Sequence, residues 1–174
     1  MRKRLNRSFY KQDALTVAPA LVGKLLVRRL DNGALMKLRI SETEIYRGEE
    51  DTACHARFGK TNRSAIMYEA GGLAYIYMIY GLHFLLNVVT GKKDEPQAVL
   101  IRTTLEYNGP AKLTKELKIE KNLNGINLAE SNELWIEDDG FLATYKTAPR
   151  IGIDYVAEPY KSINWRFILI TDKS

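Results

Sequence analysis

The chain has 174 residues, of which 45% are hydrophobic and 27% charged, a composition that excludes disordered and fibrous proteins. Lys and Arg number 26 against 21 Asp and Glu, and the net charge of +5 favours a polyanionic partner such as nucleic acid. A single cysteine, Cys54, excludes an internal disulfide framework and suits a reducing cytoplasm.

The N-terminal residues 1–7 are basic, but no apolar run of a signal peptide follows them. The apolar stretch 14–22 is broken by Pro19 and is too short to span a bilayer. We therefore expect a cytoplasmic protein, nucleoid-associated if bacterial, with no membrane partner. Residues 1–7 are expected to form a solvated, partly disordered arm.

In chain order, local patterns predict short helices among strands. Residues 13–22 favour a helix that Asp13 caps and Gly23 ends, and the segment 109–117 favours another with Pro110 in its first turn. Residues 61–67 are expected to hold a short helix within the loops. Strands are expected at residues 24–30, 36–46, 73–89 (two, meeting at Tyr80 and Gly81), 97–103, 135–136, 151–153 and 165–170. The fold class is α+β: we expect one domain over residues 1–174 with a curved, mainly antiparallel, open-barrel-like sheet flanked by short helices.

Two acids end the strand that starts at Met36. Alternate residues from Met36 to Tyr46 are expected to share one face, which is apolar until Glu42 and Glu44. Such a pair suits acid–base chemistry at an acetal-like carbon, whose cationic transition state gains from a nearby carboxylate. A solvent-exposed strand with alternating acids explains the same pattern.

Aromatic and polar residues follow in the next strands. Tyr75 and Tyr77 alternate onto one face and, with Tyr46, could stack on a flat base; core packing is the alternative. Asn87 and Arg102 interrupt apolar strands, and buried polar groups require partners, whether substrate or an internal network.

Other chemistries are excluded by residue type. His55, His83 and Cys54 are too few and too scattered for a zinc site, and one cysteine cannot form the paired motif of a zinc deaminase. No glycine-rich phosphate loop is present, and Gly71-Gly72 alone is a weak signal.

Read together, the motifs resemble the alkyladenine (3-methyladenine) DNA glycosylase family, in collinear order over nearly the whole chain. They are Glu42-Thr43-Glu44-Ile45-Tyr46, Asp51-Thr52-Ala53-Cys54-His55, the segment 75–83, Asn87, the segments 98–102 and 109–113, Arg150-Ile151-Gly152-Ile153 and Trp165-Arg166-Phe167. The resemblance implies a monofunctional enzyme that hydrolyses damaged purines from double-stranded DNA as a monomer, with no metal, cofactor or Schiff-base lysine.

The resemblance also implies roles for individual residues. Glu44 matches the glutamate that activates the hydrolytic water, and Arg102 matches the arginine that helps to hold it, with the backbone carbonyl near Ile151 as a third ligand.

Further roles concern the DNA. The residues that sandwich and orient the flipped base correspond to Tyr46, His55 and Tyr77, and Asn87 corresponds to the asparagine that screens against the amino group of guanine. Tyr80 corresponds to the tyrosine inserted into the DNA gap, and Lys112 and His83 to DNA-backbone contacts.

The chain departs from the family pattern in places. Ile45 stands where alanine is usual, which we expect to put a larger side chain beside the base, and Asn62 and Tyr68 replace a usual proline and phenylalanine. Residues 106–109 stand where members usually carry a long basic insert, and its loss puts DNA affinity and substrate breadth in question more than catalysis.

Two other functions remain open. A nucleic-acid binding module could share the fold without the chemistry, although a pure binder has no need of a carboxylate where phosphates approach. A hydrolase of nucleosides or sugars could use Glu42 and Glu44 as a pair, although an exposed Tyr80 and the basic charge balance disfavour it.

Overall fold

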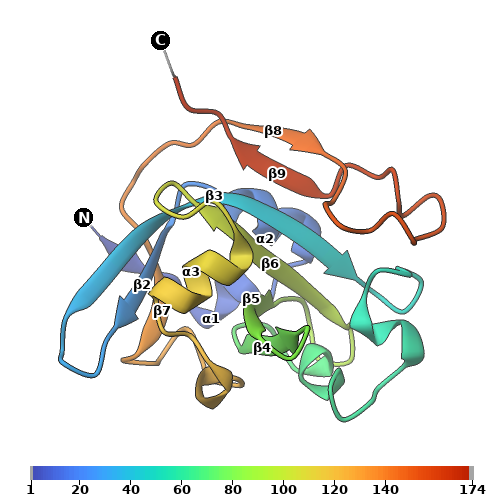
Figure 1. Cartoon of the computed structure of the whole chain (residues 1–174), viewed down its shortest axis with the longest axis horizontal. Helices are drawn as coiled ribbons and strands as arrows, with labels where there is room; N and C mark the ends of the chain where they lie inside the picture. Colours follow the sequence, from blue (N-terminus) through green and yellow to red (C-terminus); the bar gives the residue numbers. More distant parts are fainter. Residues whose placement is uncertain (1, 173–174) are drawn as a thin grey trace.

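The computed structural model describes residues 2–172 and has an α+β fold built on an open, curved sheet (Figure 1). Its strands are β1 (Lys3–Arg4), β2 (Leu25–Arg29), β3 (Leu35–Arg47), β4 (Ala74–Ile79), β5 (His83–Val89), β6 (Gln97–Thr104), β7 (Leu134–Asp138), β8 (Tyr145–Ala148) and β9 (Arg166–Leu169). Its helices are α1 (Arg7–Tyr10), α2 (Ala14–Leu21) and α3 (Pro110–Glu116), with 3-10 turns η1 (His55–Phe58), η2 (Ala65–Tyr68) and η3 (Lys121–Leu123).

All strand pairings are antiparallel, and the main order is β1-β7-β2-β3-β6-β5-β4, with β9 joining β3 to β8. The terminal strands β1 and β4 do not pair with each other, so the sheet stays open. Strand β3 connects its two halves, because its first residues pair with β2 and its later residues with β6 and β9 (Figure 1). The predicted α+β class with a curved, mainly antiparallel sheet is confirmed.

The first predicted helix forms as α2. The Asp13 side chain accepts a hydrogen bond from the Leu15 N–H at 2.9 Å and so satisfies one of the free amides at the helix start. Gly23, just beyond the helix end, has a φ of +86°, and a Cβ there would lie 2.7 Å from the Ala143 Cβ. Glycine is therefore required both for the left-handed conformation and for the close approach of this loop.

The predicted pair of strands in residues 73–89 forms the hairpin of β4 and β5. Tyr80 and Gly81 have φ values of +52° and +62°, as the two central residues of a type I′ turn require. The Leu82 N–H donates to the Ile79 carbonyl at 3.1 Å and closes the turn. The turn leaves the Tyr80 side chain 91% exposed.

The main hydrophobic core lies between the sheet and helices α2 and α3. Ile45, Val99 and Val88 lie side by side on β3, β6 and β5 and belong to this core. Helix α2 packs on β3, and α3 packs on β5 and β6. Each fully buried Leu, Ile or Val contributes roughly 1.5–3 kcal/mol to the stability of the fold through loss of apolar surface from water. This packing therefore fixes the positions of the strands, and with them the residues on the other face of the sheet.

The alternation predicted for β3 is wrong in its second half. Leu38 and Ile40 face the main core, and so does Ile45, an odd number of residues later. The β3–β6 register is irregular between Ile40 and Thr43, and the alternation changes phase there. Glu44 therefore lies on the face opposite to Leu38 and Ile40.

Two further expectations are corrected. The N-terminal arm is ordered from Lys3 to Arg7, because β1 pairs with β7 and the Arg7 guanidinium donates to the Gly71 carbonyl at 2.6 Å. Residues 151–153 form a loop, not a strand. Strand β8, which alternation did not reveal, is defined by its pairing with β9.

Candidate active site

The candidate site occupies the sheet face opposite the main core. Glu44, Leu100, Asn87 and Tyr75 form one row across β3, β6, β5 and β4, each opposite its neighbour in register. Tyr46 lies opposite Ala98 in the next row. Side chains alternate along β4, β5, β6 and the later part of β3, so the core residues between them fix the direction of these polar and aromatic side chains.

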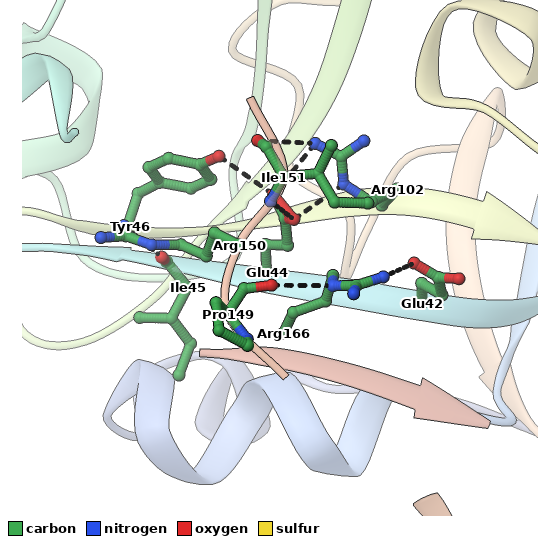
Figure 2. Close-up of polar contacts among 9 residues, drawn as sticks. All are labelled: Glu42, Glu44, Ile45, Tyr46, Arg102, Pro149, Arg150, Ile151 and Arg166. Carbon is green, nitrogen blue, oxygen red and sulfur yellow. Dashed lines mark hydrogen bonds and ion pairs between the residues drawn. The ribbon is translucent and has the colours of Figure 1, made fainter. Parts of the chain in front are cut away.

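Glu44 is fully buried and accepts four hydrogen bonds (Figure 2). Arg102 donates from Nε to Oε2 at 2.8 Å and from Nη2 to Oε1 at 3.1 Å. The Tyr46 hydroxyl donates to Oε1 at 3.0 Å, and the Ile151 N–H donates to Oε2 at 3.0 Å. Each carboxylate oxygen thus has two donors, which replace the water that a buried carboxyl group gives up.

The two side chains that donate to Glu44, Tyr46 and Arg102, are both protonated at neutral pH. Burial, and then the Glu44 charge, raises the pKa of Tyr46 well above its ordinary value, so its hydroxyl remains a donor at neutral pH. Burial lowers the pKa of Arg102, but attraction to Glu44 and the hydrogen bond between them outweigh it and raise the net value. Arg102 also donates from Nη2 to the Ile151 carbonyl at 3.4 Å, so the carboxylate, the guanidinium and this carbonyl converge.

An aromatic pocket opens beside Glu44. It is lined by Tyr46, Ala53, His55, Met67, Tyr75, Tyr77, Asn87 and Ala98. The His55 and Tyr77 ring centroids are 4.5 Å apart, and those of Tyr75 and Tyr77 are 5.2 Å apart. The cavity measures about 20 Å³, which is room for about one water molecule, so a purine enters only if these rings separate.

His55 is a neutral wall of this pocket. Its Nδ1 lies 2.8 Å from the Tyr75 hydroxyl. Burial lowers the pKa of His55 to about 4, and the nearby cations Arg63 and Arg57 act in the same direction. A neutral imidazole at physiological pH can pack against a cationic base without charge repulsion.

Asn87 is 2% exposed, and its Nδ2 donates to the Tyr75 carbonyl at 3.2 Å. This bond accounts for one polar group among the apolar residues of β5, and the same side chain lines the aromatic pocket. The structure therefore brings Glu44, Arg102, Tyr46 and Asn87 to one place, together with the two other predicted pocket residues, His55 and Tyr77.

The three residues predicted to contact DNA lie apart from the carboxylate. Tyr80 is at the β4–β5 hairpin tip, and His83 follows it on an exposed position of β5. Lys112 is exposed on α3, which packs against β5. Beside the hairpin an open groove of about 350 Å³ runs between β5 and α3, with His83, Lys115 and Lys118 among its lining residues.

A buried ion pair behind the pocket was not identified from sequence as a pair. Asp51 and Arg150 are both buried and form two hydrogen bonds of 2.7 and 2.9 Å. Arg150 also donates to the Ile45 carbonyl at 2.9 Å, and its guanidinium carbon lies 5.0 Å from the Tyr46 ring centroid. Through its hydrogen bond to the Ile45 carbonyl, Arg150 ties the loop of Ile151 to β3, where the Ile151 N–H donates to Glu44 (Figure 2).

Two expectations about neighbouring residues need revision. Glu42 pairs with Arg166 at 3.3 Å and not with Glu44 (Figure 2), so each acid has its own arginine. Ile45 is fully buried in the main core and does not line the pocket, since residues next to Glu44 and Tyr46 point to the other face.

Within residues 2–172, no three or more His, Cys, Asp or Glu side chains are grouped so as to hold a metal ion. No helix in the same range has the length and apolar character to cross a membrane.

The family model described as methylpurine-DNA glycosylase matches residues 8–107 and 103–173. The two matched segments overlap at residues 103–107, beside residues 106–109, where family members usually carry the long basic insert.

Curated relatives cover almost the whole chain. A protein of Natranaerobius thermophilus is 41% identical over 190 residues, covering 95% of each chain. One from Borreliella burgdorferi is 42% identical over 183 residues, covering 97% of each chain. One from Clostridium perfringens is 40% identical over 201 residues, covering 98% of this chain and 97% of the relative. All three bear the name "Putative 3-methyladenine DNA glycosylase".

Proposed function

Because the chain belongs to the methylpurine-DNA glycosylase family and is a DNA N-glycosylase, we propose that it flips damaged purines out of duplex DNA and hydrolyses them with a water activated by Glu44. The substrates are alkylated or deaminated purines of the 3-methyladenine, 7-methylguanine, hypoxanthine and ethenoadenine class. The enzyme acts as a cytoplasmic monomer without metal or cofactor, and its product starts base excision repair. The observation that carries the proposal is the buried Glu44 carboxylate, paired with Arg102 beside an aromatic pocket.

Base flipping explains the pocket. The glycosidic bond of a stacked base is out of reach, so the nucleotide must leave the helix at a cost of a few kcal/mol. Tyr46 on one side and His55 with Tyr77 on the other would sandwich the base. An alkylated purine can be cationic, and a cation against aromatic faces gains roughly 0.5–2 kcal/mol.

Hydrolysis needs one base and one positioned water. The water oxygen bonds to C1′ of the sugar while the bond from C1′ to the purine nitrogen breaks, and the bonding electrons leave with the purine. The water proton passes to Glu44, and the carboxylate also stabilises the cationic sugar. Arg102 and the Ile151 carbonyl orient the water. A cationic purine leaves as a neutral molecule, so it needs little acid catalysis.

The reaction is tested with duplexes that each carry one of the four lesions. Under single-turnover conditions, free purine and abasic sites are measured by chromatography and by alkaline cleavage. We expect release of at least one of these purines, and release of none would refute the proposed substrate class.

Tyr80 should act as the wedge that fills the gap left by the flipped nucleotide. For Tyr80→Ala we expect binding to a lesion duplex to weaken about 5- to 150-fold, because base–aromatic stacking contributes roughly 1–3 kcal/mol. Salt-sensitive binding to undamaged duplex should stay nearly unchanged, and Tyr80→Phe, which keeps the ring, should resemble wild type. Equal losses for damaged and undamaged DNA in a fluorescence anisotropy titration would argue against a wedge.

Asn87 should discriminate against normal guanine through its exocyclic amino group. Asn87→Ser removes the amide from the pocket, and we expect the ratio of guanine to hypoxanthine release to rise roughly tenfold as a buried polar mismatch is relieved, because hypoxanthine is guanine without that amino group. Ethenoadenine release serves as the internal control, since that base lacks the amino group. An unchanged ratio would remove this role from Asn87.

A further inference from the structure

The Glu44 carboxylate has no free acceptor position. A carboxylate offers about four lone-pair directions, and here each oxygen accepts two hydrogen bonds, from Arg102 and Tyr46 on Oε1 and from Arg102 and Ile151 on Oε2. A water that is to give its proton to Glu44 must first donate a hydrogen bond to it. One of the four present donors therefore has to leave before hydrolysis.

Three of these donors are held firmly. Arg102, whose side chain is 14% exposed, makes a two-pronged, charge-assisted contact with Glu44, and breaking it would leave the fully buried carboxylate without its cation. The Ile151 N–H belongs to the main chain, next to Arg150, which the buried pair with Asp51 fixes in place. The Tyr46 hydroxyl is the one neutral side-chain donor and is the least costly to displace.

Tyr46 is also a wall of the aromatic pocket, whose cavity of about 20 Å³ is far too small for a purine. The rings of the pocket must move apart for a base to enter. Movement of the Tyr46 ring would pull its hydroxyl away from Glu44 Oε1, now 3.0 Å away. Entry of the base and release of this acceptor position are thus linked through one side chain.

We propose that the Tyr46 hydroxyl occupies the place of the hydrolytic water on Glu44 until a base fills the pocket. Entry of the purine displaces the hydroxyl, and the water takes its position between Glu44, Arg102 and the Ile151 carbonyl. A base that enters only partway leaves Glu44 capped and is not hydrolysed. This inference rests on the proposed function, because it concerns the same carboxylate and the same water.

The variant Tyr46→Phe tests the proposal, because it keeps the stacking ring and removes only the hydroxyl. If the hydroxyl must leave Glu44 before hydrolysis, its absence removes a step that costs a hydrogen bond. We expect single-turnover release of 7-methylguanine to become about 3- to 10-fold faster, with the dissociation constant for the lesion duplex within about twofold of wild type. Damage to the structure would slow the reaction, so acceleration is specific to this role.

Tyr77→Phe is the matched control, since Tyr77 lines the same pocket and Glu44 has four other donors. This variant should not be accelerated. A Tyr46→Phe enzyme as slow as or slower than wild type would overturn the proposal, because the hydroxyl would then serve the transition state. The proposed function fails separately, if wild type releases no purine at all.

A second measurement needs no variant. Wild type can be crystallised with a duplex whose lesion carries a 2′-fluorine, which slows glycosidic cleavage by destabilising the cationic sugar. We expect the Tyr46 hydroxyl to lie beyond hydrogen-bond distance of Glu44, with a water in its place. A retained contact near the present 3.0 Å with the base in the pocket would contradict the proposal.

Discussion

Glu44→Gln is expected to lower single-turnover release of 7-methylguanine by about 10²- to 10⁴-fold, the range typical of a lost general base. Glutamine has nearly the same shape, but its amide cannot take the water proton or stabilise a cationic sugar. Its NH2 group would also meet the donors that now surround the carboxylate, which come from Arg102, Tyr46 and Ile151. Free purine is measured by chromatography over a time course.

The other acid of the same strand provides the control. Glu42 lies two residues away and pairs with Arg166, so Glu42→Gln should retain a rate within a few fold of wild type. Binding of Glu44→Gln to the lesion duplex should persist, since the pocket rings are unchanged. If Glu44→Gln is as fast as wild type, or if Glu42→Gln is the inactive variant, Glu44 is not the base.

The largest effect on stability is expected at the Asp51–Arg150 pair. Both side chains are buried, and Asp51 also accepts hydrogen bonds from the Arg47 and Ala53 amides at 3.0 Å. Asp51→Asn would leave the Arg150 charge buried without a counterion, which typically costs about 3–5 kcal/mol. Urea unfolding followed by circular dichroism should show a loss of this size in the free energy of unfolding.

A weaker pair serves for comparison, because Arg28 is buried but also donates hydrogen bonds to the main-chain carbonyls of Leu117, Arg29 and Lys118. The Glu133 side chain is 58% exposed and lies 3.9 Å from Arg28, so Glu133→Gln should lower the free energy of unfolding by less than about 1 kcal/mol. A loss below about 1 kcal/mol in Asp51→Asn as well would mean that the buried pair does not hold the site together.

Much of the site face follows from local sequence. In β4, β5 and β6 the alternation of side chains places Tyr75, Tyr77, Asn87 and Arg102 away from the core, as period-two reading predicts. The hairpin turn at Tyr80 and Gly81 was also readable, because glycine after a large residue between two apolar runs favours a reversal. These features depend on neighbours close in sequence.

Contacts between residues far apart in the sequence could not be predicted from the sequence alone. The alternation of side chains in β3 changes phase where its pairing partners change from β2 to β6 and β9. No residue type in the strand predicts this change. The pairing of Asp51 with Arg150 joins residues 99 positions apart. The sequence predicts a strand at residues 151–153, yet tertiary contacts decide the path of this loop. The family resemblance, and not the periodicity of the strand, identifies Glu44 rather than Glu42 as the general base.

The most direct test of the proposed hydrolysis counts the products of one wild-type turnover on a 7-methylguanine duplex, with sodium borohydride added to a parallel sample. Hydrolysis by a Glu44-activated water predicts free 7-methylguanine and abasic sites in equal amounts, intact DNA strands and no enzyme trapped on the DNA. Absence of free base, or strand cleavage together with a borohydride-trapped covalent complex, would contradict it.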